Sequence, residues 1–219
     1  MGIKAVISDL DGVIVNSEAE HFLSFQKMLR VDYAIDYTKE ENKEFLGTTD
    51  VHVFTILKSR YPQIKDSLTQ LIKRRTELFL EIFKNRAKAL AGVESLFSYL
   101  KSQNIPLAVG TSASRGVMNF TLDTLKLKHY FKTLVCADDV KQGKPAPDIY
   151  LEVSKRLNIL PESCLVLEDS HYGVQAAKAA GMKCIAIPCG PTLKQNFSHA
   201  DHVVKSLTEV TPVFLKALP

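Results

Sequence analysis

Short apolar runs alternate with helical patterns along most of this chain, and the alternation predicts a parallel sheet covered by helices. The runs are nearly continuously apolar, which is typical of strands buried on both faces. The predicted strands are 3–8, 106–110, 133–137, 164–167, 184–187 and, more weakly, 202–204. The predicted helices between them are 93–103, 115–125, 148–157 and 173–180, with Gly181 as a left-handed helix stop.

Residues 16–89 interrupt this alternation, because they carry helical patterns and no convincing strand. Ser17 and Glu20 have the spacing of a capping box. The helix that they would start carries an apolar face at Phe22, Phe25 and Leu29. A second start of the same kind is predicted at 38–41, and further helical patterns cover 51–59 and 64–86.

This organisation predicts an α/β fold with an inserted helical domain. The sheet domain would consist of residues 1–15 and 90–219, with helices on both faces of a parallel sheet. The insert would consist of residues 16–89, between the first strand and the remainder of the sheet.

Composition narrows the classes of protein that the chain can belong to. Its 219 residues are 46% hydrophobic and 24% charged, which is ordinary for a globular protein with a sizeable core. The net charge of +4 is scattered, and the densest basic run, 73–75, is too short to indicate nucleic-acid binding. No apolar run approaches the roughly 20 residues of a membrane helix, and no signal peptide is recognisable. We therefore expect neither nucleic acid nor membrane as a partner. We also expect the protein to be a monomer.

The four cysteines lack the spacing of a metal site, and three of them lie in or beside predicted strands. We therefore expect reduced thiols in a cytoplasmic protein and no zinc site. The cysteines are Cys136, Cys164, Cys184 and Cys189.

Paired carboxylates end the first predicted strand. Asp9 and Asp11 are one residue apart, so they project to the same side of an extended segment. The carboxyl ends of parallel strands form the edge where ligands bind in open α/β sheets. Gly12 follows, and a glycine allows the backbone to approach a ligand closely. The alternative is that one aspartate caps a turn and the other is solvated.

Other polar residues follow later strands at the same predicted edge. Thr111 and Ser112 follow the second strand, Glu168 and Asp169 follow the fourth, and Lys144 stands in a proline-pinned loop before a helix. Carboxylates from two strand ends can hold Mg²⁺, and a cation would also relieve their mutual repulsion. Lysine and hydroxyl groups can hold phosphate oxygens, which leaves one aspartate to attack phosphorus.

Four segments in this order resemble the haloacid dehalogenase-like superfamily. They read DLDGVIVNSEAEHF, LAVGTSAS, GKPAPDIY and LEDSHYGVQAAKAAGM, and the similarity spans essentially the whole chain. The closest resemblance is to the helical-cap branch that includes β-phosphoglucomutase and small sugar phosphatases. The resemblance implies a Rossmann-like core with an all-helical cap domain.

The resemblance also implies a role for each matching residue. Asp9 would be the nucleophile that forms an aspartyl-phosphate. Asp11 would protonate the leaving oxygen and then activate water. Thr111, the Ser112 amide and Lys144 would hold the transferring phosphoryl group.

Magnesium is the cofactor that the resemblance implies. Asp9, the backbone carbonyl of Asp11, and Asp169 would ligate it. Glu168 would either bind the ion directly or contact the groups that bind it, and the sequence does not distinguish these two roles.

Three further residues are candidates for contacts with substrate. His21 matches a cap histidine of the mutase, with a surface histidine as an equally good alternative. Arg75 stands where the mutase-like pattern places a cap lysine that reaches toward phosphate, with a solvated helix face as the alternative. Arg115 follows the second strand and is a weaker candidate for a distal anion.

One segment departs from the mutase pattern. The mutase cap carries Lys-Gly-x-x-Arg, whereas residues 46–50 read Leu-Gly-Thr-Thr-Asp. A carboxylate at Asp50 would repel a second phosphate rather than hold it. Because a mutase must retain a bisphosphate, this departure favours hydrolysis.

The predicted function is therefore a Mg²⁺-dependent phosphatase acting on small phosphorylated metabolites, most simply sugar or polyol monophosphates. A phosphosugar mutase is the first alternative. The second is a receiver-like module phosphorylated on Asp9, which would use similar residues but lacks an inserted helical domain.

Overall fold

The computed structural model describes residues 2–45, 48 and 50–218 and contains two compact units. The first unit consists of Met1–Asn16 and Ala87–Pro219, and the second of Ser17–Arg86. We call them the core unit and the helical unit. Among the described residues, no helix has the length and apolar character needed to cross a bilayer.

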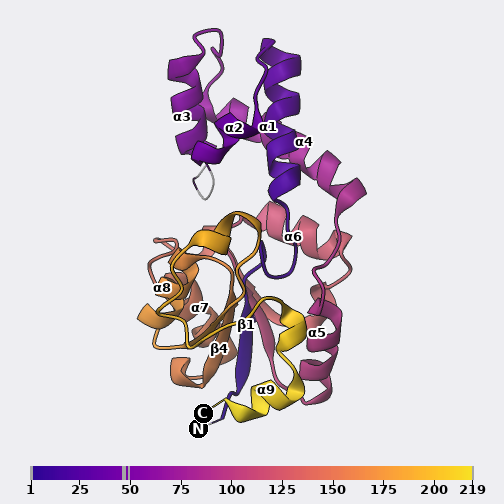
Figure 1. Ribbon diagram of the computed structural model, residues 1–219, viewed down its shortest axis with the longest axis vertical. Coiled ribbons are helices and arrows are strands. Elements are labelled where there is room, and N and C mark those ends of the chain that lie inside the picture. Colours follow the sequence, from indigo (N-terminus) through magenta and orange to yellow (C-terminus); the bar gives the residue numbers. More distant parts are fainter. Residues whose placement is uncertain (1, 46–47, 49, 219) are drawn as a thin grey trace. The chain divides into compact units, whose positions relative to one another are not determined.

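A six-stranded parallel sheet forms the centre of the core unit (Figure 1). Its strand order is β3-β2-β1-β4-β5-β6, so β1 lies between β2 and β4. The strands are β1 (Ala5–Ser8), β2 (Leu107–Gly110), β3 (Phe131–Val135), β4 (Cys164–Glu168), β5 (Lys183–Ala186) and β6 (His202–Val203). The predicted α/β fold with a Rossmann-like parallel sheet is confirmed.

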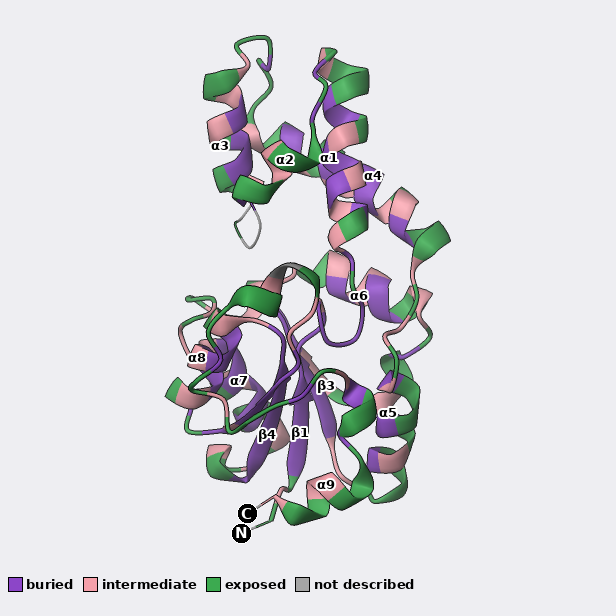
Figure 2. Ribbon diagram, viewed as in Figure 1, coloured by how far each residue is buried: buried purple, intermediate pink, exposed green. Residues whose placement is uncertain are grey.

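Two apolar clusters cover the two faces of this sheet. Within β1, Val6 packs on one face while Ala5 and Ile7 pack on the other, as the alternation of side chains along a strand requires. Helices α5 (Val93–Ser102) and α6 (Arg115–Thr124) pack on the Val6 face. Helices α7 (Asp148–Leu157) and α8 (His171–Ala179) pack on the Ile7 face. Strands β1 and β4 are buried along their whole length (Figure 2).

The chain ends in a short helix, α9 (Pro212–Ala217), which the sequence analysis did not predict. Its Phe214 and Leu215 pack against the apolar cluster on the Val6 face. Six residues are too few to show a helical period, which explains why the pattern gave no signal.

The helical unit contains α1 (Glu18–Tyr33), α2 (Lys39–Asn42), α3 (Asp50–Arg60) and α4 (Leu68–Arg86). Helix α1 packs along α4, and α3 also contacts α4. The predicted apolar face of α1 is confirmed, because Phe22, Phe25 and Leu29 are all buried in this unit's core. The role of this unit as a cap stays a prediction.

Helix starts show where the sequence patterns were right and wrong. Thr38 caps α2 as predicted, since its Oγ1 accepts a hydrogen bond from Glu41 N at 3.2 Å. The capping box at Ser17 was wrong: its side chain makes no capping bond, and its ψ of 4° is not the extended conformation that capping uses. Glu20 instead pairs with Arg86 at 2.9 Å.

A strand and a helix show why some predicted bounds are displaced along the chain. Strand β3 ends at Val135 rather than 137, because the next residues form a 3₁₀ turn in which Asp139 accepts from Cys136 N at 2.9 Å. Helix α8 begins at His171 rather than 173, because the Ser170 hydroxyl caps it by accepting from Gly173 N. Gly181 has a φ of 75°, as expected for a left-handed helix stop.

Candidate active site

Asp9 lies immediately after β1, with only 7% of its surface exposed. Its backbone N–H donates to the carbonyl of Leu167 in β4 at 2.9 Å, which holds the residue against the neighbouring strand. Asp11 is two residues further, in a turn closed by hydrogen bonds from Ile14 and Val15 N to the Leu10 carbonyl. The two predicted aspartates therefore stand at the carboxyl end of the central strand.

Gly12 allows a third aspartate to approach this turn. Its φ is 82°, and a Cβ at this position would lie 2.2 Å from Cγ of Asp169. A side chain here would collide with that carboxylate, so glycine is required sterically as well as conformationally. The group that approaches Gly12 closely is thus the Asp169 side chain, where the sequence analysis expected a ligand.

Glu168 is the last residue of β4 and is fully buried. Its Oε1 accepts hydrogen bonds from Lys144 Nζ at 2.6 Å and Tyr150 Oη at 2.8 Å. Its Oε2 accepts from the backbone N and the hydroxyl of Ser170, both at 2.9 Å. Because a carboxylate has about four acceptor positions, both oxygens are already engaged.

Gly173 makes room for this carboxylate. A Cβ at Gly173 would lie 1.7 Å from Oε1 of Glu168. The first turn of α8 therefore passes directly over the Glu168 side chain, at a distance that only glycine permits.

Lys144 joins the two strand ends. Its Nζ lies 2.7 Å from Oδ1 of Asp9 and 2.6 Å from Oε1 of Glu168, and only 7% of its side chain is exposed. Burial alone would lower the pKa of Lys144, but the charges of Asp9 and Glu168 outweigh burial and raise the pKa well above its usual value. The lysine is therefore a permanent cation between two carboxylates.

Three carboxylates form a cluster that fits a hard cation. One oxygen from each of Asp9, Glu168 and Asp169 lies within 4.8 Å of the others. Burial, reinforced by the neighbouring Glu168 charge and opposed by Lys144, raises the pKa of Asp9 to about 7 and that of Asp169 to about 8. A bound Mg²⁺ would compensate this crowding of negative charge, and oxygen donors are its preferred ligands.

The end of β2 brings hydroxyl groups to the same edge of the sheet. Thr111 is buried, and its backbone N–H donates to Val135 of β3 at 3.1 Å. Its Oγ1 accepts from Ala113 N at 3.1 Å, while Ser112 is exposed. Since β2 is the neighbour of β1, Thr111 stands at the same edge of the sheet as Asp9, and its role in holding phosphate stays a prediction.

Arg115 begins α6, outside the carboxylate cluster. Its Nη2 donates to Oδ1 of Asp139 at 2.6 Å, and its backbone N donates to Asp138 at 2.8 Å. This ion pair fixes the start of α6. The predicted contact of Arg115 with a distal anion stays a prediction.

His21 and Arg75 meet inside the helical unit. Arg75 Nη1 lies 2.9 Å from His21 Nδ1, and Arg75 Nη2 donates to Oδ2 of Asp50. The His21 ring stacks on Phe79 at a centroid distance of 4.2 Å. Burial first, and then the Arg75 charge, lower the pKa of His21 to about 3, so its imidazole is neutral at physiological pH. Leu46, Gly47 and Thr49 of the segment that departs from the mutase lie outside the described residues.

Sequence reasoning did not foresee the contacts of Tyr150, Ser170 and Gly173 with Glu168. Tyr150 looked like one more apolar position on a core-facing helix, so its hydroxyl gave no signal. Thr192 was missed as well, and its hydroxyl donates to Asp169 Oδ2 at 3.3 Å. Tyr150 and Thr192 are 18 and 23 residues from the carboxylates that they contact, so spacing carries no information about these contacts.

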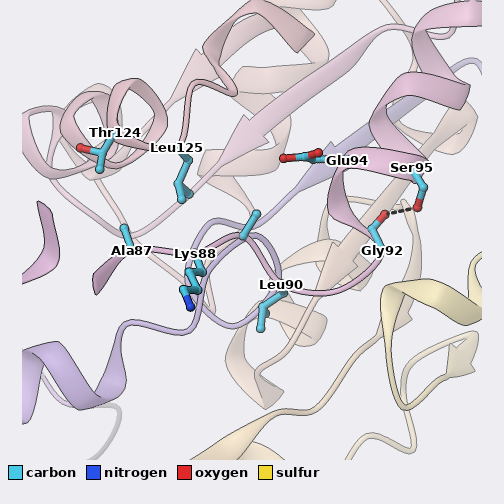
Figure 3. A pocket seen from close by; sticks show the side chains of 9 residues that line it. Ala87, Lys88, Leu90, Gly92, Glu94, Ser95, Thr124 and Leu125 are labelled. Atoms are coloured by element: carbon cyan, nitrogen blue, oxygen red, sulfur yellow. Dashed lines mark hydrogen bonds between the residues drawn. The ribbon is translucent and has the colours of Figure 1, made fainter. Parts of the chain in front are cut away.

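The core unit also contains a cavity of about 500 Å³ whose lining includes no residue of the carboxylate cluster (Figure 3). Its lining comes from the segment around Lys88 and Leu90, the start of α5 at Glu94 and Ser95, and the end of α6 at Thr124. None of the predicted site residues lines it, so the carboxylate cluster is the better candidate for the active site.

Comparison with known proteins identifies the family of this chain. Residues 6–187 match the family described as haloacid dehalogenase-like hydrolase. A phosphorylated carbohydrates phosphatase of Thermotoga maritima is 37% identical over 183 residues, which is 84% of this chain and 84% of that protein.

Solved structures show the same fold. CbbY from Rhodobacter sphaeroides, in complex with phosphate, has a TM-score of 0.85 and 27% identity, and the match covers 95% of this chain and 96% of that one. A putative β-phosphoglucomutase from Thermotoga maritima has a TM-score of 0.85 and 33% identity, with 99% and 100% covered. These matches confirm both the family and the enzyme class predicted from the sequence: the chain belongs to the haloacid dehalogenase-like hydrolases.

Proposed function

We propose that this enzyme is a Mg²⁺-dependent phosphatase that hydrolyses small phosphorylated metabolites, in particular sugar or polyol monophosphates, through a phosphorylated Asp9. The observation that carries the proposal is the cluster of Asp9, Lys144, Glu168 and Asp169 at the carboxyl end of the sheet. The similarity to a phosphatase of phosphorylated carbohydrates supports the substrate class.

In the proposed first step, a carboxylate oxygen of Asp9 attacks phosphorus and the bond to the leaving oxygen breaks. Asp11, as a carboxylic acid, gives its proton to that oxygen, so the product leaves as an alcohol. In the second step Asp11, now a carboxylate, takes a proton from water. The water oxygen attacks phosphorus, releasing inorganic phosphate and restoring Asp9.

Charge compensation comes from residues around Asp9. Lys144, already beside Asp9, would hold the phosphoryl oxygens together with Thr111 and the Ser112 amide. Asp9, the carbonyl of Asp11, and Asp169 are the proposed Mg²⁺ ligands. Glu168 would act through Lys144 and Ser170, because its oxygens already accept four hydrogen bonds. When bound, Mg²⁺ would supply positive charge to the oxygens of the transferring group.

The Asp50–Arg75 pair supports hydrolysis over the mutase alternative. Arg75 is the cation that would hold a second phosphate if the helical unit acts as a cap. Its guanidinium already contacts the Asp50 carboxylate, so a distal phosphate would have to displace an anion. The likeness to a putative β-phosphoglucomutase is what keeps the mutase as a second candidate.

The proposal is tested with purified protein and a panel of sugar and polyol monophosphates. We expect release of inorganic phosphate in Mg²⁺ and loss of release in EDTA or in Asp9→Asn. Efficient conversion of β-glucose 1-phosphate to glucose 6-phosphate without phosphate release would overturn the hydrolase assignment in favour of the mutase. A single, near-stoichiometric release from p-nitrophenyl phosphate would favour the receiver-like alternative instead.

A further inference from the structure

Tyr150 lies at the meeting point of the elements that build the carboxylate cluster. It is the third residue of α7 and is fully buried. Its ring packs against the last residue of β2, where a Cβ on Gly110 would lie 3.1 Å from Tyr150 Cε1. Lys144 Nζ lies 5.0 Å from the ring centroid, within the range of a cation–π contact. The ring is thereby fixed between β2 and the lysine.

Among the described residues, the hydroxyl of Tyr150 has one hydrogen-bond partner, Oε1 of Glu168, at 2.8 Å. The same oxygen accepts from Lys144 Nζ at 2.6 Å, so tyrosine and lysine share one acceptor. Burial raises the pKa of Tyr150 well above its usual value, so the phenol remains a neutral donor. Because Tyr150 and Glu168 are both fully buried, water has no direct access to replace this donor.

We propose that Tyr150 is a positioning residue for phosphoryl transfer, which acts by sharing the Glu168 carboxylate with Lys144. A buried carboxylate that loses a donor attracts its remaining cation more strongly. Lys144 also donates to Asp9 at 2.7 Å. The tyrosine hydroxyl therefore determines how strongly Glu168 draws Lys144 Nζ away from Asp9 and the phosphoryl group. The inference rests on the proposed function, because it assigns Tyr150 a part in that reaction.

The first test is Tyr150→Phe, which keeps the ring against Gly110 and Lys144 and removes only the hydroxyl. Loss of a buried hydrogen bond to a charged group corresponds to about a 10- to 100-fold change, and we expect kcat to fall by about tenfold or more. We expect KM and the Kd for Mg²⁺ from calorimetry to change less than about threefold, because the proposed metal ligands are not partners of the hydroxyl. The matched control is Tyr130→Phe, whose exposed hydroxyl contacts Ser98 in the same unit and whose loss should leave kcat unchanged.

The second test asks whether Tyr150 acts through Glu168. The free energy of unfolding in EDTA is measured for wild type, Tyr150→Phe, Glu168→Gln and the double variant. We expect Tyr150→Phe to lower the free energy of unfolding clearly less in the Glu168→Gln background, where residue 168 is neutral, than in the wild-type background. Equal effects in both backgrounds would overturn the proposed route.

The outcomes separate this inference from the function on which it rests. Wild-type protein that releases no phosphate from any monophosphate would overturn both. A wild type that turns over, with Tyr150→Phe equal to it in kcat, would overturn the role of Tyr150 alone. So would a parallel loss of kcat, substrate binding and Mg²⁺ binding, since that would indicate a collapsed site rather than a misplaced lysine.

Discussion

Lys144 Nζ lies 2.7 Å from Oδ1 of Asp9, so the proposed nucleophile is paired with a buried cation before any substrate arrives. The same lysine contacts Glu168, and it is thus the buried cation between two buried carboxylates. Removing one partner of such a pair leaves an uncompensated charge, whereas removing both is much less costly.

Lys144→Met is therefore expected to lower the free energy of unfolding by about 3–5 kcal/mol, measured by urea denaturation in EDTA. Adding Glu168→Gln to this variant should restore part of the loss, because it removes the stranded charge. The control is Lys155→Met, an exposed lysine of α7 paired with Glu152, which should have little effect. Equal stability of Lys144→Met and Lys155→Met would contradict the described charge pairing.

Gly173→Ala is expected to displace the Glu168 carboxylate, because the new methyl would lie 1.7 Å from Oε1. Overpacking of this kind costs about 1–3 kcal/mol in stability, and phosphatase activity should fall with it. Thermal unfolding and phosphate release measure the two effects.

Gly116→Ala provides the matched control, since Gly116 lies in the first turn of α6 and a Cβ there would meet nothing within 4 Å. This change should be neutral or stabilise by up to about 1 kcal/mol, because alanine favours helix over glycine. Indistinguishable effects of the two alanines would contradict the close packing of α8 over Glu168.

The stability of the metal-free protein should fall as pH rises. Burial and neighbouring charges raise the pKa of Asp9 to about 7 and that of Asp169 to about 8, whereas both would titrate near pH 4 in the unfolded chain. Between about pH 4 and 8 the folded state therefore holds protons that the unfolded state has lost, so the free energy of unfolding decreases across that window.

Magnesium should reverse this trend, because it binds the ionised carboxylates. We expect the increase in Tm caused by Mg²⁺ to be larger at about pH 8 than at about pH 5. Thermal unfolding with Mg²⁺ or with EDTA at both pH values measures the difference. An equal increase at both would show that the metal binds away from Asp9 and Asp169.

Asp50→Asn tests the ion pair within the helical unit. The Arg75 side chain is 8% exposed, and within the described residues its Nε has no hydrogen-bond partner. Loss of the Asp50 charge should lower stability by about 1–3 kcal/mol, because Arg75 would stay buried without the carboxylate that pairs with it among the described residues. Urea denaturation measures this change. The exposed pair of Lys43 and Glu40 offers the control, because Glu40→Gln should change the free energy of unfolding little. Unchanged stability of Asp50→Asn would contradict the pairing.

The sheet and the edge that carries the carboxylate cluster were predictable because each signal is local. A buried strand is a short apolar run, and Asp9, Thr111 and Glu168 follow such runs directly. Parallel strands bring their carboxyl ends to one edge, so sequence order alone placed these residues at the same edge of the sheet.

The partners of those residues were not predictable, because they depend on packing. Tyr150 contacts Glu168 only because α7 packs against β2, β3 and α8, and Asp50 meets Arg75 only because α3 packs on α4. Sequence reasoning treated Asp50 as a repelling charge and Arg75 as a phosphate ligand. The structure joins them as a pair, which spacing over 25 residues could not indicate.

The proposed phosphorylation of Asp9 is tested most directly by trapping it. The enzyme is mixed with Mg²⁺ and a monophosphate substrate, quenched in acid and reduced with borohydride, which converts an aspartyl-phosphate to homoserine. Mass spectrometry of the N-terminal peptide should then find homoserine at position 9 in the wild type and not in Asp9→Asn. Phosphate release accompanied by an unmodified Asp9, or by homoserine at another aspartate, would contradict the account.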